Sequence, residues 1–214
     1  MCYQLVQSCR APAQVSKLTL HRKQTKNSWA RDDPAVALVL LALLAVVAVA
    51  YGAAYRASSP LAYAALVAQA WAAFLGGGAL AATATWAWAN RHCRAGAAAP
   101  HSVEQSVEWL FAWDVHCNAF VPVLLLVYVA NFLLLPLTMS GDGLVPCLVG
   151  NALYTAAAGH YLYITFQGYV VLPFLQPDKL RPLLAGIVVA AALGVAATLL
   201  HFNIASFMLG FSAA

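Results

Sequence analysis

AVALVLLALLAVVAVAYGAAY, at residues 35–55, is the stretch of sequence that decides the fold, because it contains no charged side chain. An α-helix needs about 20 predominantly apolar residues to cross the hydrocarbon core of a bilayer, and this stretch meets that length. Pro34 suits the first turn of such a helix, and Asp32 and Asp33 would lie near the positive end of its dipole. Residues 35–55 therefore predict a transmembrane helix.

Four further apolar segments reach the same length. They span residues 61–89, 115–137, 144–172 and 183–211. We therefore predict an all-α integral membrane protein, with a bundle of about five transmembrane helices over residues 35–211. A short amphipathic and basic segment, residues 1–34, precedes the bundle on the cytosolic side.

The composition agrees with a protein that is embedded in lipid. Hydrophobic residues make up 63% of the chain and charged residues only 8%, and the mean hydropathy is +0.77. A soluble domain carries about 25% charged residues. A chain this poor in charge cannot cover a surface that faces water, so the bilayer is the expected partner of most of the molecule.

The basic residues indicate the orientation of the bundle. If the N-terminus is cytosolic, ten of the 11 Lys and Arg residues lie on the cytosolic side, and only Arg56 lies on the other side. Cytosolic loops of membrane proteins carry an excess of Lys and Arg. We therefore predict a cytosolic N-terminus and, with five spans, a lumenal C-terminus.

The first residues of the chain have a weaker pattern. Cys2, Leu5, Val6 and Cys9 would share one stripe of a short helix, which is typical of a segment lying in the membrane interface. A disordered tail is the alternative reading of the same segment.

A basic run with a tryptophan precedes the first span and forms the candidate cytosolic interaction site. Basic residues beside a cytosolic membrane face attract anionic lipid, and they also set the topology. A tryptophan at the water edge, flanked by charges of both signs, indicates a more specific protein docking site. We do not expect a nucleic-acid partner, because the run is brief and no aromatic residues interleave with it. The candidate residues are Arg22, Lys23, Lys26, Trp29, Arg31, Asp32 and Asp33.

A second set of polar residues falls at or within the predicted spans. Such groups are expensive in lipid and usually face the interior of the bundle, where they can join helices by hydrogen bonds. Two of them, Asp114 and His116, are two positions apart, so a straight helix would point them to nearly opposite sides. The candidate intramembrane polar core consists of Asp114, His116, Asn118, Asn151 and His160.

Two other functions stay open at this stage. An intramembrane metal-dependent hydrolase could take its ligands from Asp114, His116, His160 and His201, although the chain has no HExxH motif and no two histidines at helical spacing. A small transporter could be lined by Asn118, Asn131, Asn151 and Gln167, although we find no internal repeat. We expect neither a cofactor nor a resident metal in the leading interpretation.

Four motifs resemble a known family. They are HRKQTKNSWARDDPAV at residues 21–36, VEWLFAWDVHCNAFVP at 107–122, GNALY at 150–154 and YLYITFQGYVVLPFL at 161–175. In this order and at these separations, they are similar to the eukaryotic Unc-fifty family of multi-span membrane proteins of the Golgi and the early secretory pathway. Members of that family usually have a longer cytosolic N-terminus than residues 1–20 provide here.

The resemblance implies a function that composition and spacing do not show. It implies a non-enzymatic protein of the Golgi membrane that supports vesicle-mediated transport, with the ER or the inner nuclear membrane as alternative locations. Family members are linked to the recruitment of Arf exchange factors and to the surface delivery of membrane cargo such as receptors. The family supplies no catalytic residues to assign here.

Overall fold

The structure is a computed structural model, and it describes residues 12–31, 33–95, 105–140 and 143–213. Every regular element within these ranges is helical, and a single antiparallel bridge joins Arg94 and Leu175. Five long elements form the body of the molecule: α3 (Ala35–Ala54), α4 (Pro60–Trp88), α5 (Trp109–Val123), α8 (Leu144–Val170) and α9 (Pro177–Leu199). Shorter elements are α2 (Pro12–Lys26), η1 (Ala89–Cys93), η2 (Leu124–Ala130), α6 (Asn131–Leu133), α7 (Leu135–Thr138) and α10 (Ile204–Ala213).

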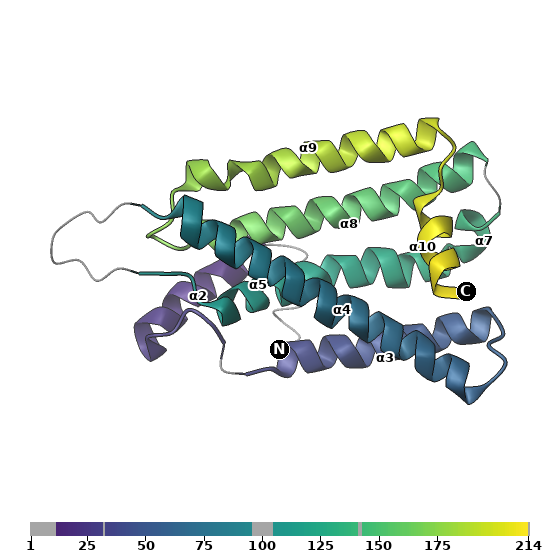
Figure 1. Ribbon diagram of the computed structural model, residues 1–214, viewed down its shortest axis with the longest axis horizontal. Coiled ribbons are helices and arrows are strands. Elements are labelled where there is room, and N and C mark those ends of the chain that lie inside the picture. Colours follow the sequence, from purple (N-terminus) through teal and green to yellow (C-terminus); the bar gives the residue numbers. More distant parts are fainter. Residues whose placement is uncertain (1–11, 32, 96–104, 141–142, 214) are drawn as a thin grey trace, which may run out of the picture.

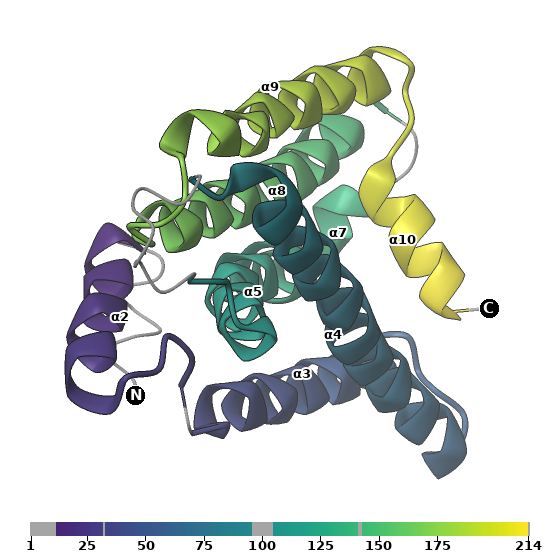
Figure 2. The same cartoon turned by 60° about the vertical axis from the view of Figure 1, so that its left-hand side comes forward.

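The long helices run up and down in an antiparallel bundle (Figure 1). Helix α5 lies in the middle, where it contacts α4 and α8, and α9 packs along the outer side of α8 (Figure 2). Helix α2 lies at one end of the bundle, where it contacts α8. The first turns of α5 and α9 and the last turns of α4 and α8 lie at the same end, which we call the α2 end. The short helix α10 lies at the opposite end, which we call the α10 end.

The prediction of an all-α membrane protein is confirmed. Four helical stretches are long and apolar enough to cross a membrane: Ala35–Ala54, Pro60–Cys93, Trp109–Leu133 and Pro177–Leu199. Helix α8, with 27 residues, is about 40 Å long and could also cross a core of about 30 Å. Its most apolar stretch is less hydrophobic than the four stretches above, and it packs between α5 and α9.

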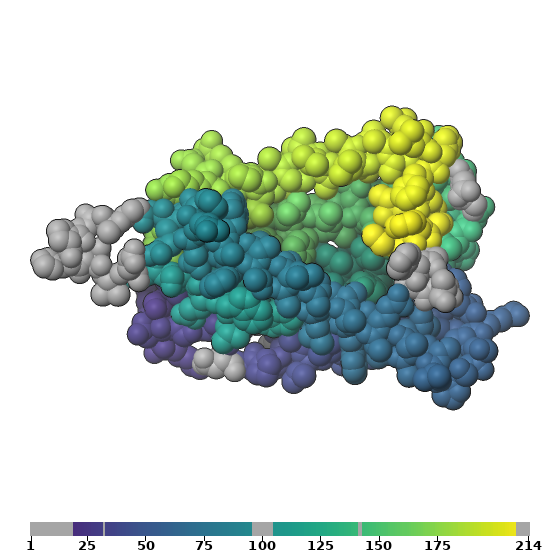
Figure 3. Space-filling view, viewed as in Figure 1, coloured from purple at the N-terminus to yellow at the C-terminus, as the bar shows by residue number. Residues whose placement is uncertain are grey.

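Lipid-facing surfaces are apolar, as a bilayer requires. Val188, Leu193 and Leu199 on α9 are 70%, 64% and 73% exposed, and Leu80 on α4 is 75% exposed. Figure 3 shows α9 along one edge of a face of the molecule, α4 crossing that face diagonally, and α10 at one end of it.

The predicted segment 183–211 contains two helices instead of one. Helix α9 begins at Pro177 and ends at Leu199, and α10 begins at Ile204 in a different direction (Figure 1). The chain reverses at His201, which has a φ of 56°. The Asn203 side chain then accepts a hydrogen bond from the Ser206 N–H at 3.1 Å and caps α10.

The segment after α5 is irregular because of proline. Pro122 lies inside α5, and the chain continues as the π-helix η2, followed by α6 and α7. Proline cannot donate a backbone hydrogen bond and disturbs the helix around it. The backbone carbonyl of Tyr128 within η2 accepts a hydrogen bond from the Tyr51 hydroxyl of α3 at 3.2 Å, which ties the irregular segment to its neighbour.

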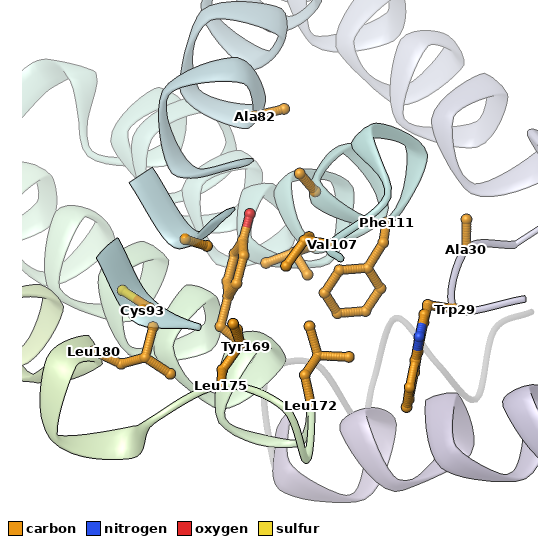
Figure 4. Close-up of a cluster of buried hydrophobic side chains, with 13 residues drawn as sticks. Trp29, Ala30, Ala82, Cys93, Val107, Phe111, Tyr169, Leu172, Leu175 and Leu180 are labelled. Carbon is orange, nitrogen blue, oxygen red and sulfur yellow. The ribbon is translucent and has the colours of Figure 1, made fainter. Parts of the chain in front are cut away.

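Two groups of buried apolar side chains hold the bundle together. One group joins α3, α4 and α5 through Leu40, Leu44 and Phe74, each of which is fully buried. The other group fills the α2 end and draws on α4, α5, α8, α9 and the segment before α3 (Figure 4). In Figure 4, Tyr169 and Phe111 lie at the centre of this second group, and Trp29 closes one side of it.

Candidate functional site

The carboxylate of Asp114 is the centre of a polar network at the α2 end. Its Oδ2 accepts a hydrogen bond from the backbone N–H of Arg31 at 2.6 Å, and its Oδ1 lies 3.2 Å from the Arg31 Nε. A second guanidinium, from Arg22, lies 3.9 Å away, and Arg31 also donates to the Asn118 side chain at 3.0 Å. The Arg31 and Asp114 side chains are only 10% and 16% exposed, so lipid and protein screen this pair less than water would.

A second carboxylate, from Glu108, binds the same segment of chain. It accepts hydrogen bonds from the Ser28 hydroxyl at 3.1 Å, the Trp29 N–H at 3.4 Å and the Ala30 N–H at 3.3 Å. Glu108 immediately precedes α5, and Asp114 lies in the second turn of that helix. The two carboxylates therefore hold residues 28–31 against the start of α5. We call residues 28–31 the strap.

Trp29 is part of the strap, and its side chain is buried and does not lie at the water edge. Its side chain is 4% exposed and packs against Phe174 with ring centroids 5.8 Å apart. The Lys23 ammonium lies 5.4 Å from the centre of the indole, a distance typical of a cation–π contact, and Arg22 donates to the Trp29 carbonyl at 3.2 Å. The sequence-based expectation of an exposed tryptophan in a docking patch therefore differs from the structure, because the indole finds an apolar partner in the loop after α8.

The remaining residues of the candidate cytosolic site are placed differently. Lys26 and Asp33 are exposed, and Asp33 accepts a hydrogen bond from the Ala35 N–H at 2.8 Å at the start of α3. Asp32 and the N-terminal stripe at residues 2–9 lie outside the described residues. The predicted site thus divides into a buried, structural part around Trp29 and Arg31 and a solvent-facing part that includes Lys26 and Asp33, with Lys23 half-buried between them.

Other basic residues gather at the same end of the bundle. Arg91 lies in η1 at the end of α4, and Lys179 and Arg181 lie in the first turns of α9; all three are exposed. The loops that carry them are fixed by backbone hydrogen bonds, since the Gln176 N–H donates to the Cys93 carbonyl at 2.8 Å and the Ala95 N–H donates to the Phe174 carbonyl at 2.9 Å.

Sequence reasoning missed the clamp that holds Val107, just before Glu108. The Asn90 side chain donates to the Val107 carbonyl at 3.0 Å and accepts from the Val107 N–H at 2.8 Å, and the Trp86 indole donates to the same carbonyl at 2.9 Å. An asparagine paired with both backbone groups of one residue imitates a β-bridge. Its only signal in the sequence is a polar residue directly after a tryptophan-rich helix end.

His116 points away from Asp114, as the helical spacing predicts. Its Nδ1 lies 2.9 Å from the Tyr161 hydroxyl of α8, and its ring packs against Phe74 of α4 with centroids 5.2 Å apart. The ring also fills the space over Gly78, where a side chain would collide with it. His116 therefore joins three helices, which is the structural role expected for an imidazole in the bundle core.

The histidines of the metal-dependent hydrolase alternative do not converge. His160 is exposed on α8 and bonds within its own helix to the Ala156 carbonyl at 2.9 Å, while His201 lies in the turn at the α10 end. Within the described residues, which include all four proposed ligands, no group of three or more His, Cys, Asp or Glu side chains could hold a metal ion. The geometry that the hydrolase alternative requires is thus not found.

The amides of the transporter alternative also lie apart, and three of them, Asn118, Asn151 and Gln167, make hydrogen bonds to nearby groups. Asn151 donates to the Thr198 hydroxyl at 3.1 Å and the Phe202 carbonyl at 2.9 Å, and accepts from the Ile204 N–H at 2.8 Å. Gln167 donates to the Tyr163 hydroxyl at 2.8 Å. Asn118 accepts a hydrogen bond from Arg31, as described above. Asn131, directly after η2, is fully buried, and its amide group has no hydrogen-bond partner among the described residues. The four amides thus lie at separate places along the bundle.

Comparison with known proteins identifies the family. A model of the UNC-50 family matches residues 1–213. The chain belongs to the UNC-50 family. It is 41% identical over 171 residues to Protein unc-50 homolog of Dictyostelium discoideum, covering 78% of this chain and 64% of that protein.

Animal members of the UNC-50 family are similar over nearly the same range. The chain is 36% identical over 182 residues to Protein unc-50 of Caenorhabditis elegans (84% of this chain, 56% of that protein) and 33% identical over 179 residues to Protein unc-50 homolog of Homo sapiens (81% and 66%). The matched part thus spans less than two thirds of the length of these relatives. No solved structure matches the chain.

Proposed function

We propose that this UNC-50 family protein acts without catalysis in the Golgi and early secretory membranes, where it supports vesicle-mediated transport. Its α2 end faces the cytosol and presents basic side chains to soluble trafficking factors, Arf exchange factors among them. Membrane cargo such as receptors would be handled by the same membrane-embedded body.

The proposal rests on the distribution of the basic residues, most of which lie at the α2 end of the bundle. Lys23, Lys26, Arg91, Lys179 and Arg181 all lie at the α2 end, whereas Arg56 lies in the turn between α3 and α4 at the other end. Positive residues at one end of a membrane bundle mark its cytosolic side. A charged surface on a rigid support can steer and hold a partner of opposite charge.

The strap explains why this surface has a defined shape. Glu108 and Asp114 fix residues 28–31 to α5, and Trp29 anchors α2 to the loop after α8. The lysines of α2 are therefore displayed at set positions, so that less conformational entropy is lost when a partner binds.

The test reverses the charges of two basic side chains of α2 that contact neither Glu108 nor Asp114: Lys26, which is exposed, and Lys23, which is half-buried with its ammonium over the Trp29 ring. The variant K23E/K26E is expressed as the full chain in cells that lack the native protein, and recruitment of Arf exchange factors to Golgi membranes is measured by membrane flotation and imaging. We expect recruitment to fall several-fold while the amount and the topology of the protein stay unchanged.

Arg56→Glu is the matched control, because it reverses a basic charge at the opposite end of the bundle. It should leave recruitment at the native level. Native recruitment by K23E/K26E, at equal protein level and equal topology, would refute the proposal.

A further inference from the structure

One face of α8 exposes polar side chains even though α8 lies among the long helices of the bundle. The residues on this face recur every three or four positions, so they form a single stripe along the helix. His160 and the small residues Ala152 and Ala156 are exposed, and Tyr163 is 41% exposed. We call this stripe the outer face of α8; it comprises Leu148, Ala152, Ala156, His160, Tyr163 and Gln167.

The polar part of the outer face begins near the middle of α8, a helix long enough to cross the hydrocarbon core. His160 is three residues, or about 4.5 Å, from the middle of the 27-residue helix. Its Nδ1 bonds to the Ala156 carbonyl of its own helix at 2.9 Å, which leaves Nε2 directed outward. Gln167 donates to Tyr163 at 2.8 Å, and its amide oxygen is left to accept. Polar side chains at such depth almost always face protein or water, so bare lipid is an expensive neighbour for this stripe.

We propose that the outer face of α8 is the contact between two copies of this chain in the membrane. Because both copies have the same topology, the two-fold axis of such a dimer runs along the membrane normal and the two α8 helices are parallel. Each polar group then meets its own counterpart, or a neighbour one turn away, at the same depth.

The stripe is complementary to itself in both chemistry and shape. The Nδ1–H of His160 is donated to the Ala156 carbonyl, so the neutral imidazole offers an acceptor at Nε2. The Tyr163 hydroxyl accepts from Gln167 and can still donate its own proton, so His160 of one copy can accept a hydrogen bond from Tyr163 of the other. Ala152 and Ala156 are four residues apart, and small residues at this spacing allow membrane helices to approach closely. A partner with a different sequence would have to carry polar groups at this depth by coincidence.

The first test places a photo-crosslinking amino acid at Ala156 in the full chain, expressed in membranes together with a differently tagged copy. Val188 on the lipid-facing side of α9 is the matched control position, since it is 70% exposed in a helix of similar depth. We expect a crosslinked band of twice the chain mass that carries both tags from Ala156 and none from Val188. A product of another mass, or equal yields from both positions, would overturn the proposal.

The second test measures association in nanodiscs or detergent by energy transfer between labelled copies. His160→Leu removes a hydrogen-bonding group from each copy; one interhelical hydrogen bond corresponds to about a 2.7-fold change in association, so the loss of two corresponds to about sevenfold. We expect the association constant to fall about sevenfold in His160→Leu and to recover toward the native value in His160→Gln. Unchanged association in His160→Leu, in protein that unfolds at the native temperature, would show that the helices meet elsewhere.

Discussion

Two neighbouring glycines of α4 should respond to the same substitution with opposite sign. A Cβ added at Gly78 would lie 2.9 Å from Cε1 of His116 and closer still to two other atoms of that ring. A Cβ added at Gly77 would have no heavy atom within 4 Å. Alanine stabilises a helix by about 1 kcal/mol relative to glycine, so Gly77→Ala should gain approximately that amount.

The cost at Gly78 follows from the surroundings of His116. The ring cannot move aside easily, because Phe74, Phe120 and Tyr161 pack around it with centroids 5.2 to 5.8 Å away. Overpacking of this kind costs about 1–3 kcal/mol, and a displaced ring also loses its hydrogen bond to Tyr161, worth about 1 kcal/mol. After subtraction of the gain in helix propensity, Gly78→Ala should destabilise the protein by about 2 kcal/mol.

Thermal unfolding in detergent can be followed with a thiol-reactive dye, because Cys93, Cys117 and Cys147 are free and buried. For a protein of this size, about 1 kcal/mol shifts Tm by roughly 2–4 °C. Gly78→Ala should therefore lower Tm by about 4–8 °C, and Gly77→Ala should raise it by about 2–4 °C.

A double variant tests whether the collision with the ring is the cause. In His116→Ala the space over Gly78 is open, so adding Gly78→Ala should cost little or even stabilise. The reasoning fails if Gly78→Ala and Gly77→Ala shift Tm equally, or if the His116→Ala background leaves the penalty unchanged.

Three further substitutions probe the strap and the α10 end by the same assay. Asp114→Ala should cost about 2–3 kcal/mol, because it leaves a shielded guanidinium of Arg31 without its charged acceptor, whereas Asp114→Asn should cost less. Trp29→Ala should cost about 3–5 kcal/mol and speed the tryptic cleavage of α2 in sealed vesicles, since the anchor of that helix is lost. Asn151→Ala should cost about 2–3 kcal/mol by leaving buried groups of the turn before α10 without partners. A Tm within 1 °C of the native value would contradict the role given to each residue.

The sequence predicts a helix well where the segment is apolar throughout and long enough to cross the bilayer. Residues 35–55 are apolar throughout, and α3 covers Ala35–Ala54. The break between α9 and α10 is not predictable in the same way, because residues 200–203 contain neither glycine nor proline. The turn depends on Asn151 and Asn203, whose side chains bind distant backbone groups, and such contacts have no local signature.

The polar network was only partly predictable for a related reason. Helical spacing correctly separates Asp114 from His116, since both lie on one element whose geometry is known in advance. The pairing of Asp114 with Arg31 joins residues 83 positions apart, and the spacing within either motif does not specify it. Trp29 beside several charges resembles an exposed docking residue, but the position of Phe174 decides that it is buried.

Mutations in the basic motif could change trafficking in two ways, because some of its residues hold the strap in place and others do not. Arg22, Trp29 and Arg31 contact Asp114 or the loop after α8, so their loss should first weaken the attachment of α2 to the bundle. Lys23 and Lys26 lie on the same short helix, but neither carries that attachment through Glu108 or Asp114. A partner that recognises the basic charge should therefore bind K26E less strongly than the native protein at equal Tm, because Lys26 is exposed and does not contact the Trp29 ring as Lys23 does. A partner that needs only a folded α2 end should respond to Trp29→Ala and ignore the lysines.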